Sequence, residues 1–433
     1  MKRMDVNPGG ATFRHLCVWM LSLLLVSAAA RADAVLDWNK IAVDTAVANQ
    51  QNPFAQARYA AIVQLAVFEA VNAIKGDYKP YLGTIMASPH ASAQAAAIEA
   101  AYKVLSTYFT DPASQAALAA DRTQSLASIP NNQAKLDGIA VGDAAAQVMI
   151  ALRANDGSSP PQFNIPGPAV PGVWQATPSC PVMNGIGVGI AFQWQNVTPF
   201  GIRHASDFLL SPPHALTSKR YARTYNEVMT VGSIDSTERP LDRANVVLFY
   251  AAESPTQAFN QAARQVAEQQ QRSLSENARA LALINMAIND SLVTAFFNKY
   301  HYNYWRPETA IHAGDLDGNR RTEADPQWAP FIATPCFPGY PSNHGSAANG
   351  AAAVMRRLYG EAGHWMTLTN PAVPTIVLHY ISFREITDDI SDARVFGGIH
   401  FRTDQLAGGV LGRAVGKAVY KNNLRPVHDD DDD

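Results

Sequence analysis

The sequence predicts an all-α protein, and three observations support that prediction. Apolar residues recur at helical spacing along most of the chain, alternating apolar–polar strand patterns are almost absent, and proline and glycine gather in one central segment. The chain has 433 residues, 47% of them hydrophobic and 16% charged, so it can bury a sizeable core. The net charge is −3, and no basic stretch with interleaved aromatic residues suggests nucleic-acid binding.

The first 32 residues have the pattern of a secretory signal peptide. Basic residues end at Arg14, residues 16–26 are apolar, and Ala30-Arg31-Ala32 places small residues around a cleavage site. The apolar run is short for a membrane span, and an N-terminal anchor is the alternative interpretation. We therefore expect a mature chain that starts at residue 33, has no membrane span, and is exported to the periplasm or the extracellular space.

Helical patterns fill the first part of the mature chain. Its alanine residues at close intervals allow helices to approach one another closely, as a helical bundle requires. The predicted helices cover residues 35–48, 54–74, 91–109 and 132–152.

Residues 155–213 interrupt the helical pattern. Closely spaced prolines, interleaved with glycine, exclude long regular elements in this segment. It also carries large aromatic residues, among them Trp174 and Trp194, which favour a packed cover over a free linker between domains.

Helical periodicity resumes after the proline-rich segment and is strongest at residues 275–300. The five aspartates at residues 429–433 predict a solvated, disordered tail. Besides the helix of the central motif described next, the remaining predicted helices cover residues 218–231, 241–252, 375–387 and 404–420.

A loop that turns into a helix organises the chemistry of this sequence. Residues 337–346 read Phe-Pro-Gly-Tyr-Pro-Ser-Asn-His-Gly-Ser and precede an alanine-rich run. Ser342 or Asn343 can cap the helix, whose first N–H groups lack internal partners and carry partial positive charge. Such a helix end can bind an oxyanion, and His344 adds a titratable imidazole at the same place. The stretch therefore predicts chemistry on a phosphate-like ligand.

Three further pieces of sequence provide groups for the same chemistry. Lys299 and Arg306 offer an ammonium and a guanidinium at the end of the longest predicted helix. Arg394 precedes Gly397-Gly398, which allow the backbone to approach a ligand. Asp404 follows His400 by four residues, a spacing that on a helix places the carboxylate beside the imidazole and fixes its tautomer.

In their order and spacing these pieces resemble the signature of the type 2 phosphatidic acid phosphatase and vanadium haloperoxidase superfamily. That signature runs Lys, six residues, Arg-Pro, then Pro-Ser-Gly-His, then Ser-Arg, five residues, His, three residues, Asp. Here Asn343 replaces the usual glycine and keeps its backbone amide, and Ala393 replaces the usual serine. Stretches around Trp174, Trp194 and residues 328–338 also resemble the secreted, soluble chloroperoxidase-like branch.

The resemblance implies a single helical domain over residues 33–428, with a four-helix bundle that cradles an oxyanion site and residues 155–213 around its mouth. The implied cofactor is vanadate, and phosphate is able to occupy the same site. His400 would bind the vanadium, and His344 would be the acid–base group. The vanadate oxygens would be held by Lys299, Arg306, Arg394, Ser342 and the amide of Asn343.

The activity implied by the resemblance is oxidation of a halide by hydrogen peroxide to a hypohalous species. Lys299 is also expected to polarise the peroxide. Phe337 stands where chloroperoxidase-like members carry Phe and bromoperoxidases carry His. Phe296 lies one turn before Lys299, so it either lines the halide pocket or belongs to the ordinary core. The sequence leaves the halide, the organic acceptor and the oligomeric state open.

An exported acid phosphatase is the alternative, because the same pocket fits a phosphomonoester. In that interpretation His400 attacks phosphorus and forms a phosphohistidine, Asp404 orients His400, and His344 protonates the leaving alcohol. A non-catalytic oxyanion-binding protein is a third possibility, but it does not need two imidazoles and a supporting carboxylate. The haloperoxidase interpretation is favoured because the similarity extends beyond the motif.

The cysteine count predicts one disulfide in the mature chain. Cys17 belongs to the predicted signal peptide, which leaves Cys180 and Cys336, each after a Thr-Pro pair in a loop. An even pair in an oxidising compartment suggests a bridge, and two free thiols are the alternative.

Overall fold

The computed structural model describes residues 33–83 and 85–427. The predicted signal peptide (1–32) and the predicted acidic tail (429–433) lie outside these described residues. From Asp33 onward the chain forms one compact unit. The predicted domain boundaries at residues 32 and 428 stay predictions.

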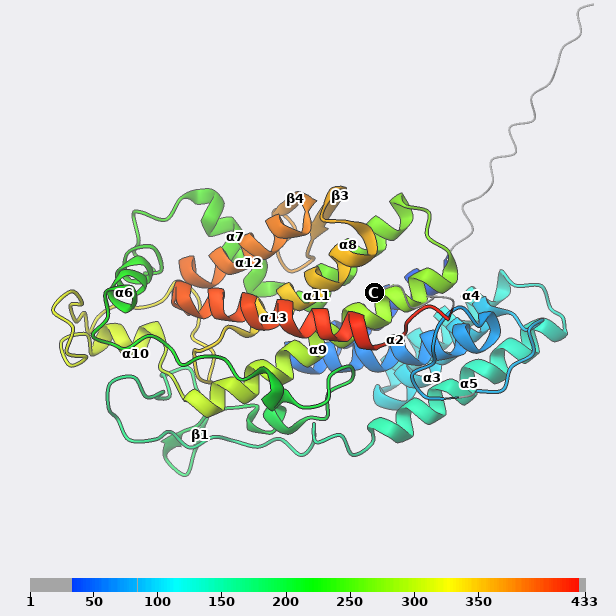
Figure 1. Ribbon diagram of the computed structural model, residues 1–433, viewed down its shortest axis with the longest axis horizontal. Coiled ribbons are helices and arrows are strands. Elements are labelled where there is room, and N and C mark those ends of the chain that lie inside the picture. Colours follow the sequence, from blue (N-terminus) through cyan, green and yellow to red (C-terminus); the bar gives the residue numbers. More distant parts are fainter. Residues whose placement is uncertain (1–32, 84, 428–433) are drawn as a thin grey trace, which may run out of the picture. The chain divides into compact units, whose positions relative to one another are not determined.

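The all-α prediction is confirmed, because thirteen α-helices account for most of the described chain (Figure 1). Two short 3-10 helices and two small antiparallel hairpins complete it. The α-helices are α1 (Ala34–Ala48), α2 (Pro53–Lys75), α3 (Ala93–Tyr108), α4 (Pro112–Ala127), α5 (Gln133–Arg153), α6 (Lys219–Val231), α7 (Leu241–Ala252), α8 (Pro255–Gln269), α9 (Leu274–Tyr302), α10 (Pro307–His312), α11 (Asn343–Tyr359), α12 (Phe383–Phe396) and α13 (Arg402–Asn422).

Three of these helices, α4, α8 and the six-residue α10, are absent from the predicted set, although α4 and α8 carry a clear start signal. Asp111 caps α4 through the N–H of Ser114, Ser254 caps α8 through the N–H of Gln257, and each cap is followed by proline. In α4 only two residues are buried, so an apolar stripe is almost missing. In α4 the helix start was therefore readable where hydrophobic periodicity was not, whereas α8 also has buried residues at helical spacing.

The predicted helix at residues 375–387 is wrong in its first half. Strand β4 (Val377–Ser382) pairs antiparallel with β3 (Ala362–Thr369), and α12 begins only at Phe383. Glutamine side chains of α8 satisfy the outer edge of β3. Gln265, for example, donates to the carbonyl of Thr367 at 2.8 Å and accepts its N–H at 2.9 Å. This tertiary pairing stabilises an extended chain where local periodicity suggested a helix.

Helix α9 is central to the part of the bundle that holds the site. It packs against α2, α11 and α13, and α11 packs in turn against α12 and α13 (Figure 1). Glycines of α13 bring its backbone against α11, since a Cβ at Gly412 would lie 2.1 Å from the carbonyl oxygen of Ser346. At Gly416 it would lie 2.4 Å from the carbonyl oxygen of Gly350. This close backbone contact packs the first half of α11 against the middle of α13.

Residues 155–213 form no α-helix, all of them being described, and they run along α9. The segment contains β1 (Val182–Met183), β2 (Ile186–Gly187), and the 3-10 helices η1 (Phe192–Asn196) and η2 (Ala205–Phe208). The buried carboxylate of Asp290 on α9 accepts the backbone N–H groups of Phe200 at 2.8 Å and Gly201 at 2.6 Å. The proline-rich segment is therefore fixed to the helix that also carries Lys299.

Helices α2 and α9 are long and apolar enough to cross a membrane by length and composition. The sequence predicts no membrane span after residue 32, but by length and composition alone these two helices qualify as candidates. In the folded chain 89% of the most apolar window of α2 and 94% of that of α9 are buried. Both are core helices in this structure.

Candidate functional site

The predicted site residues come together where several helices begin or end. Lys299 lies in the last turn of α9, and Arg306 directly precedes α10. Ser342 caps the start of α11, while Arg394 lies in the last turn of α12. His400 and Asp404 flank the start of α13. Helix ends from distant parts of the chain thus meet at one place.

Ser342 is the cap of α11, which decides between the two residues that the sequence offered. Its Oγ accepts the N–H of Gly345 at 3.1 Å, and its own N–H donates to the carbonyl of Asp404 at 3.0 Å. This second bond joins the starts of α11 and α13. Asn343 is buried, and neither atom of its side-chain amide has a hydrogen-bond partner among the described residues.

Lys299 is fully buried and held by two backbone carbonyls of the central loop. Its Nζ donates to Pro338 O at 2.6 Å and to Gly339 O at 2.9 Å. Burial, followed by the nearby Arg306, lowers the pKa of Lys299 well below its ordinary value. The loop carbonyls fix the amine, and one of its three N–H bonds is left for another acceptor.

Two buried guanidinium groups indicate an anion-binding site. Arg306 donates to the carbonyls of Phe337 at 2.9 Å and Ile399 at 2.8 Å, but its Nη2 has no partner within the described chain. Arg394 keeps Nε and Nη2 unpartnered, again counting described residues only. Burial lowers the pKa of Arg306 to about 9 and that of Arg394 to about 10. Buried charged donors require acceptors, and an oxyanion supplies them.

His400 and Asp404 form a buried pair whose geometry differs from the expected one. His400 precedes α13 instead of lying on it, and Asp404 in the first turn reaches back to it. The imidazole Nδ1 lies 3.0 Å from Asp404 Oδ2, which also accepts the N–H of Phe401 at 3.1 Å. Burial raises the pKa of Asp404 to about 7, against the opposing effect of Lys299 and Arg306. Burial and then Arg306 lower the pKa of His400, so its ring is neutral at pH 7.

His344 lies in the first turn of α11 and is partly exposed to a cavity. Burial, with Arg394 as the next cause, lowers its pKa well below 6.5. Its ring makes no hydrogen bond to another residue of the described chain. A neutral imidazole without a protein partner can accept a proton from a ligand.

The cavity beside His344 has a volume of about 400 Å³. Phe337 lines it, and its ring also covers Lys299 and Arg306, 5.3 and 5.1 Å from its centroid. The assignment of Phe337 to a halide pocket stays a prediction. Phe296 does not line the cavity. That ring is fully buried and packs behind Phe337, with the two centroids 5.4 Å apart, so it belongs to the core.

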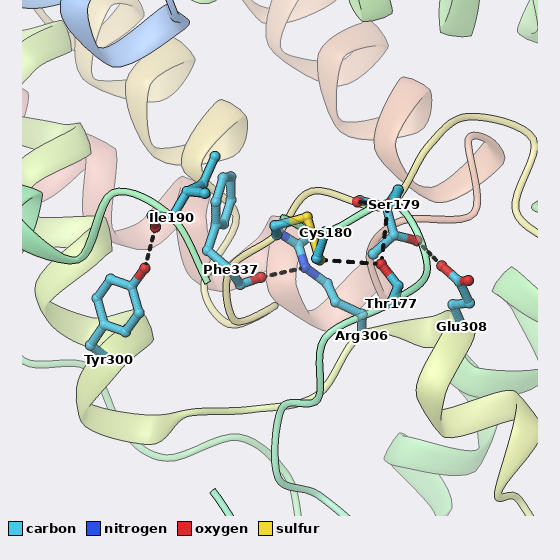
Figure 2. Close-up of a disulfide and its surroundings, with 10 residues drawn as sticks. Thr177, Ser179, Cys180, Ile190, Tyr300, Arg306, Glu308 and Phe337 are labelled. Atoms are coloured by element: carbon cyan, nitrogen blue, oxygen red, sulfur yellow. Dashed lines mark hydrogen bonds between the residues drawn. A yellow bond between two sulfur atoms is a disulfide. The ribbon is translucent and has the colours of Figure 1, made fainter. Parts of the chain in front are cut away.

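Cys180 and Cys336 are joined by a disulfide, with their Cα atoms 5.3 Å apart. Figure 2 shows the bridge next to Phe337 and Arg306. Ile190 of the proline-rich segment links this segment to two other parts of the chain. Its N–H donates to the carbonyl of Cys336 at 2.8 Å, and its carbonyl accepts the hydroxyl of Tyr300 at 2.5 Å. The proline-rich segment thereby covers one side of the site.

Sequence reasoning missed the apolar wall of this cavity. Phe54 of α2 and Leu292 of α9 line it, and both come from segments outside the motifs. The other apolar lining residues include Ile332, Pro335 and Ile399, which lie in or beside the motif segments. The sequence places Phe54 and Leu292 only within the predicted helices at residues 54–74 and 275–300. Nothing in their local sequence distinguishes a residue that faces a cavity from one that faces a neighbouring helix.

The C-terminal part of the chain matches a known protein family. Residues 279–429, which contain every predicted oxyanion-binding residue, match the family described as VCPO second helical-bundle domain. A vanadium chloroperoxidase of Curvularia inaequalis is 24% identical over 268 residues. That match covers 46% of this chain and 43% of the relative, so the chain matches less than half the length of that protein.

Solved structures show that the similarity of fold extends over nearly the whole chain. A bacterial vanadium-dependent iodoperoxidase superimposes with a TM-score of 0.76 at 21% identity, covering 91% of this chain and 96% of that one. An apo-type bacterial vanadium-dependent chloroperoxidase has a TM-score of 0.67 at 16% identity, covering 84% and 91%. The holo-type structure of such an enzyme gives the same TM-score and identity and covers 86% and 92%.

Proposed function

Because this chain belongs to the vanadium haloperoxidase family, we propose that it is a vanadate-dependent enzyme that oxidises a halide with hydrogen peroxide to a hypohalous species. The observation that carries the proposal is the set of buried, unpartnered donors around His400. Within the described residues, these are Arg306 Nη2 and Arg394 Nε and Nη2.

These residues fit vanadate, which is a small tetrahedral oxyanion with several oxygen acceptors. Arg306 and Arg394 would neutralise its oxygens, and Lys299 adds a positively charged donor when it is protonated. The hydroxyl of Ser342 and the backbone amide of Asn343 lie at the start of α11, where the helix dipole favours negative charge. Bound vanadate would supply Lewis-acid activation of the peroxide.

His400 would hold the vanadium through Nε2. With Asp404 ionised, its Oδ2 accepts the proton on Nδ1, which leaves the lone pair of Nε2 free to bond. Arg306 Nη1 lies 2.8 Å from this nitrogen and donates a hydrogen bond to its lone pair in the structure. Asp404 thus acts as a positioning residue for the imidazole.

His344 would accept the proton that hydrogen peroxide loses on binding. Its lowered pKa keeps the imidazole neutral at pH 7, and it faces the cavity through which small substrates enter. Lys299 is fixed by two loop carbonyls, and its remaining N–H bond would polarise the bound peroxide.

The same donors also suit phosphate, which keeps an acid phosphatase as the second candidate. Vanadate and phosphate are both tetrahedral oxyanions, and the His400–Asp404 pair could serve equally as a nucleophile held in place by a carboxylate. The relatives with vanadium in their names favour the haloperoxidase.

A paired assay on the purified protein tests the proposal. One arm adds orthovanadate, hydrogen peroxide and chloride, bromide or iodide, and follows halogenation of a small cyclic 1,3-dione. The other offers a phosphomonoester without vanadate. Vanadate-dependent halogenation supports the haloperoxidase. Phosphate release that vanadate inhibits, with no halogenation, would make the protein a phosphatase.

We further propose that the chain is exported after loss of residues 1–32. The disulfide between Cys180 and Cys336 supports this, because such bridges persist in oxidising compartments. Detection of a mature N-terminus at Asp33 in the periplasm or medium tests the proposal, and an intact chain in the cytoplasm would contradict it.

A further inference from the structure

The cavity at the oxyanion site is larger than a halide and a peroxide require. Its volume is about 400 Å³, whereas a water molecule in the liquid takes about 30 Å³ and a halide ion or hydrogen peroxide is of similar size. The volume of the cavity is therefore on the order of ten times that of a single small substrate. It lies in the range of volumes of pockets that enclose organic ligands.

The cavity wall has a polar part and an apolar part. Asn343, His344 and Arg394 bring the polar and charged atoms of the oxyanion site to its inner end. Phe54, Leu292 and Phe337 are buried apolar residues of the wall. Among the described lining residues there is no carboxylate and no cation besides Arg394.

The other end of the cavity opens to solvent. Asn52, Ala251 and Ala333 line the cavity and are exposed, so they mark its mouth. Two of the three are alanines, whose short side chains leave the entrance wide. A ligand that enters here passes along the apolar wall before it reaches His344.

The aromatic part of the wall is rigid. The rings of Phe54 and Phe337 meet edge to face with centroids 6.2 Å apart, and Phe296 packs against both from behind. Arg306 and Lys299 hold the central loop from the far side through the carbonyls of residues 337–339. The wall is therefore preformed, which lowers the entropic cost of binding an apolar molecule.

We infer that this cavity binds an apolar organic acceptor, so that halogenation takes place on a protein-bound molecule whose reactive carbon faces the oxyanion site. The inference rests on the proposed haloperoxidase function and names the class of its second substrate. An electron-rich arene or alkene with an apolar body of several carbons fits the divided wall. A small polar acceptor makes little use of it.

The reaction balances without a further co-reactant. Hydrogen peroxide takes two electrons from the halide and, with one proton from solvent, yields one water and the hypohalous species. The acceptor carbon then forms a bond to the halogen and loses its proton, which leaves with the hydroxyl oxygen as a second water. The overall change converts acceptor, halide, hydrogen peroxide and one proton into halogenated acceptor and two waters.

A competition between two phenols tests the inference on the vanadate-loaded protein. 4-Methylphenol and 4-hexylphenol carry equivalent reactive rings and differ by five methylene groups. Burial of one methylene favours binding about fourfold, so partial burial of the chain predicts that the wild type brominates 4-hexylphenol about tenfold or more in preference. Hypobromous acid added to the same mixture without protein gives the reference ratio.

Ala251 and Ala252 provide a matched pair of variants at the end of α7. Both are exposed, but only Ala251 lines the cavity. Ala251→Trp places an indole at the mouth and is expected to bring the product ratio close to that of free hypobromous acid. Ala252→Trp is expected to keep the wild-type ratio. A wild-type ratio equal to the reference ratio overturns the inference.

Calorimetric titration of 4-hexylphenol into the protein separates the failure of the inference from failure of the proposed function. If neither phenol is halogenated with chloride, bromide or iodide, the haloperoxidase proposal fails, and the cavity is judged by binding of 4-hexylphenol alone. Saturable binding that Ala251→Trp weakens about tenfold, with Ala252→Trp unchanged, supports an apolar ligand site. The absence of saturable binding to the wild type refutes it.

Discussion

Arg306 Nη1 lies 2.8 Å from Nε2 of His400, so a guanidinium N–H occupies the lone pair of the imidazole proposed to bind vanadium. Any ligand that bonds to Nε2 must take the place of this contact. Arg306 then gains a new acceptor in the oxygens of the ligand, since its Nη2 has no partner in the described chain. The site is thus arranged to exchange an internal hydrogen bond for an anion.

Asp404→Asn tests whether the carboxylate positions His400. The amide keeps the shape of the side chain but removes the charge that stabilises the imidazole orientation at 3.0 Å. Vanadate affinity is expected to fall about 10–100-fold, as for other partners behind a metal ligand. Calorimetry with orthovanadate measures this. Asp392→Asn, which removes a carboxylate bound to Arg402 outside the site, should leave the affinity within about twofold of the wild type.

Arg394→Met is expected to have opposite effects on stability and on binding. Without vanadate the variant should be more stable by about 1–3 kcal/mol, because a buried charge with unpartnered N–H groups in the described structure is removed. It should also lose the stabilisation by vanadate, which raises the Tm of the wild type and adds about 2.7 kcal/mol to its free energy of unfolding at a hundredfold excess over Kd. Thermal unfolding with and without orthovanadate records both.

The matched control for Arg394 is Arg243→Met. Arg243 lies 2.7 Å from Asp389 and has its charge compensated. That variant should gain no stability and should keep the full response to vanadate. An Arg394→Met protein that is destabilised without vanadate, yet responds normally to it, would contradict the assignment of Arg394 to the oxyanion pocket.

The neutral state of His344 predicts a pH dependence of stability in the vanadate-free protein. Its pKa is well below 6.5 when folded, so below pH 6.5 the unfolded chain binds a proton that the folded chain does not. The contribution of His344 to stability is present above that pH and is lost as the pH falls. Relative to His344→Gln, the wild type should lose up to about 1.4 kcal/mol per pH unit below pH 6.5.

Urea unfolding of both proteins between about pH 7.5 and pH 5 measures this difference. The comparison cancels Asp404, whose raised pKa of about 7 has the opposite slope and is common to both proteins. Parallel stability curves for the wild type and His344→Gln would show that the imidazole titrates normally in the folded state.

Removal of the disulfide should destabilise the protein but leave the hydrogen-bond donors of the oxyanion site in the chain. The bridge closes a loop with a sequence separation of 156 residues, and Cys180→Ser combined with Cys336→Ser is expected to lower the free energy of unfolding by roughly 2–5 kcal/mol. Reduction of the wild type should give the same shift. Equal stability of the reduced and oxidised wild type would contradict this.

The chemistry of the site was predictable because each donor sits at a helix end with its own local signal. Ser342 caps α11, and Lys299 lies in the last turn of α9. The spacing between His400 and Asp404 brought them together even though His400 precedes the helix. Motif spacing therefore predicted the contact although the two residues do not share a helix.

Features that depend on tertiary contacts could not be predicted in the same way. The outer edge of β3 is hydrogen-bonded by three glutamine side chains of α8, a helix roughly a hundred residues earlier in the chain. They are Gln261, Gln265 and Gln269. The apolar cavity likewise forms between segments without sequence linkage, such as Phe54 and Leu292. Local periodicity contains no information about such partners.

The most direct test of the proposed function is halide oxidation as a function of orthovanadate concentration in the wild type, His400→Ala and His379→Ala. His379 is an exposed histidine of β4 and controls for loss of an imidazole. With hydrogen peroxide present, the wild type and His379→Ala should oxidise the halide only when vanadate is added, with saturation, and His400→Ala should show no vanadate-dependent rate. A wild type that is inactive at every vanadate concentration, or a fully active His400→Ala protein, would contradict the proposed function.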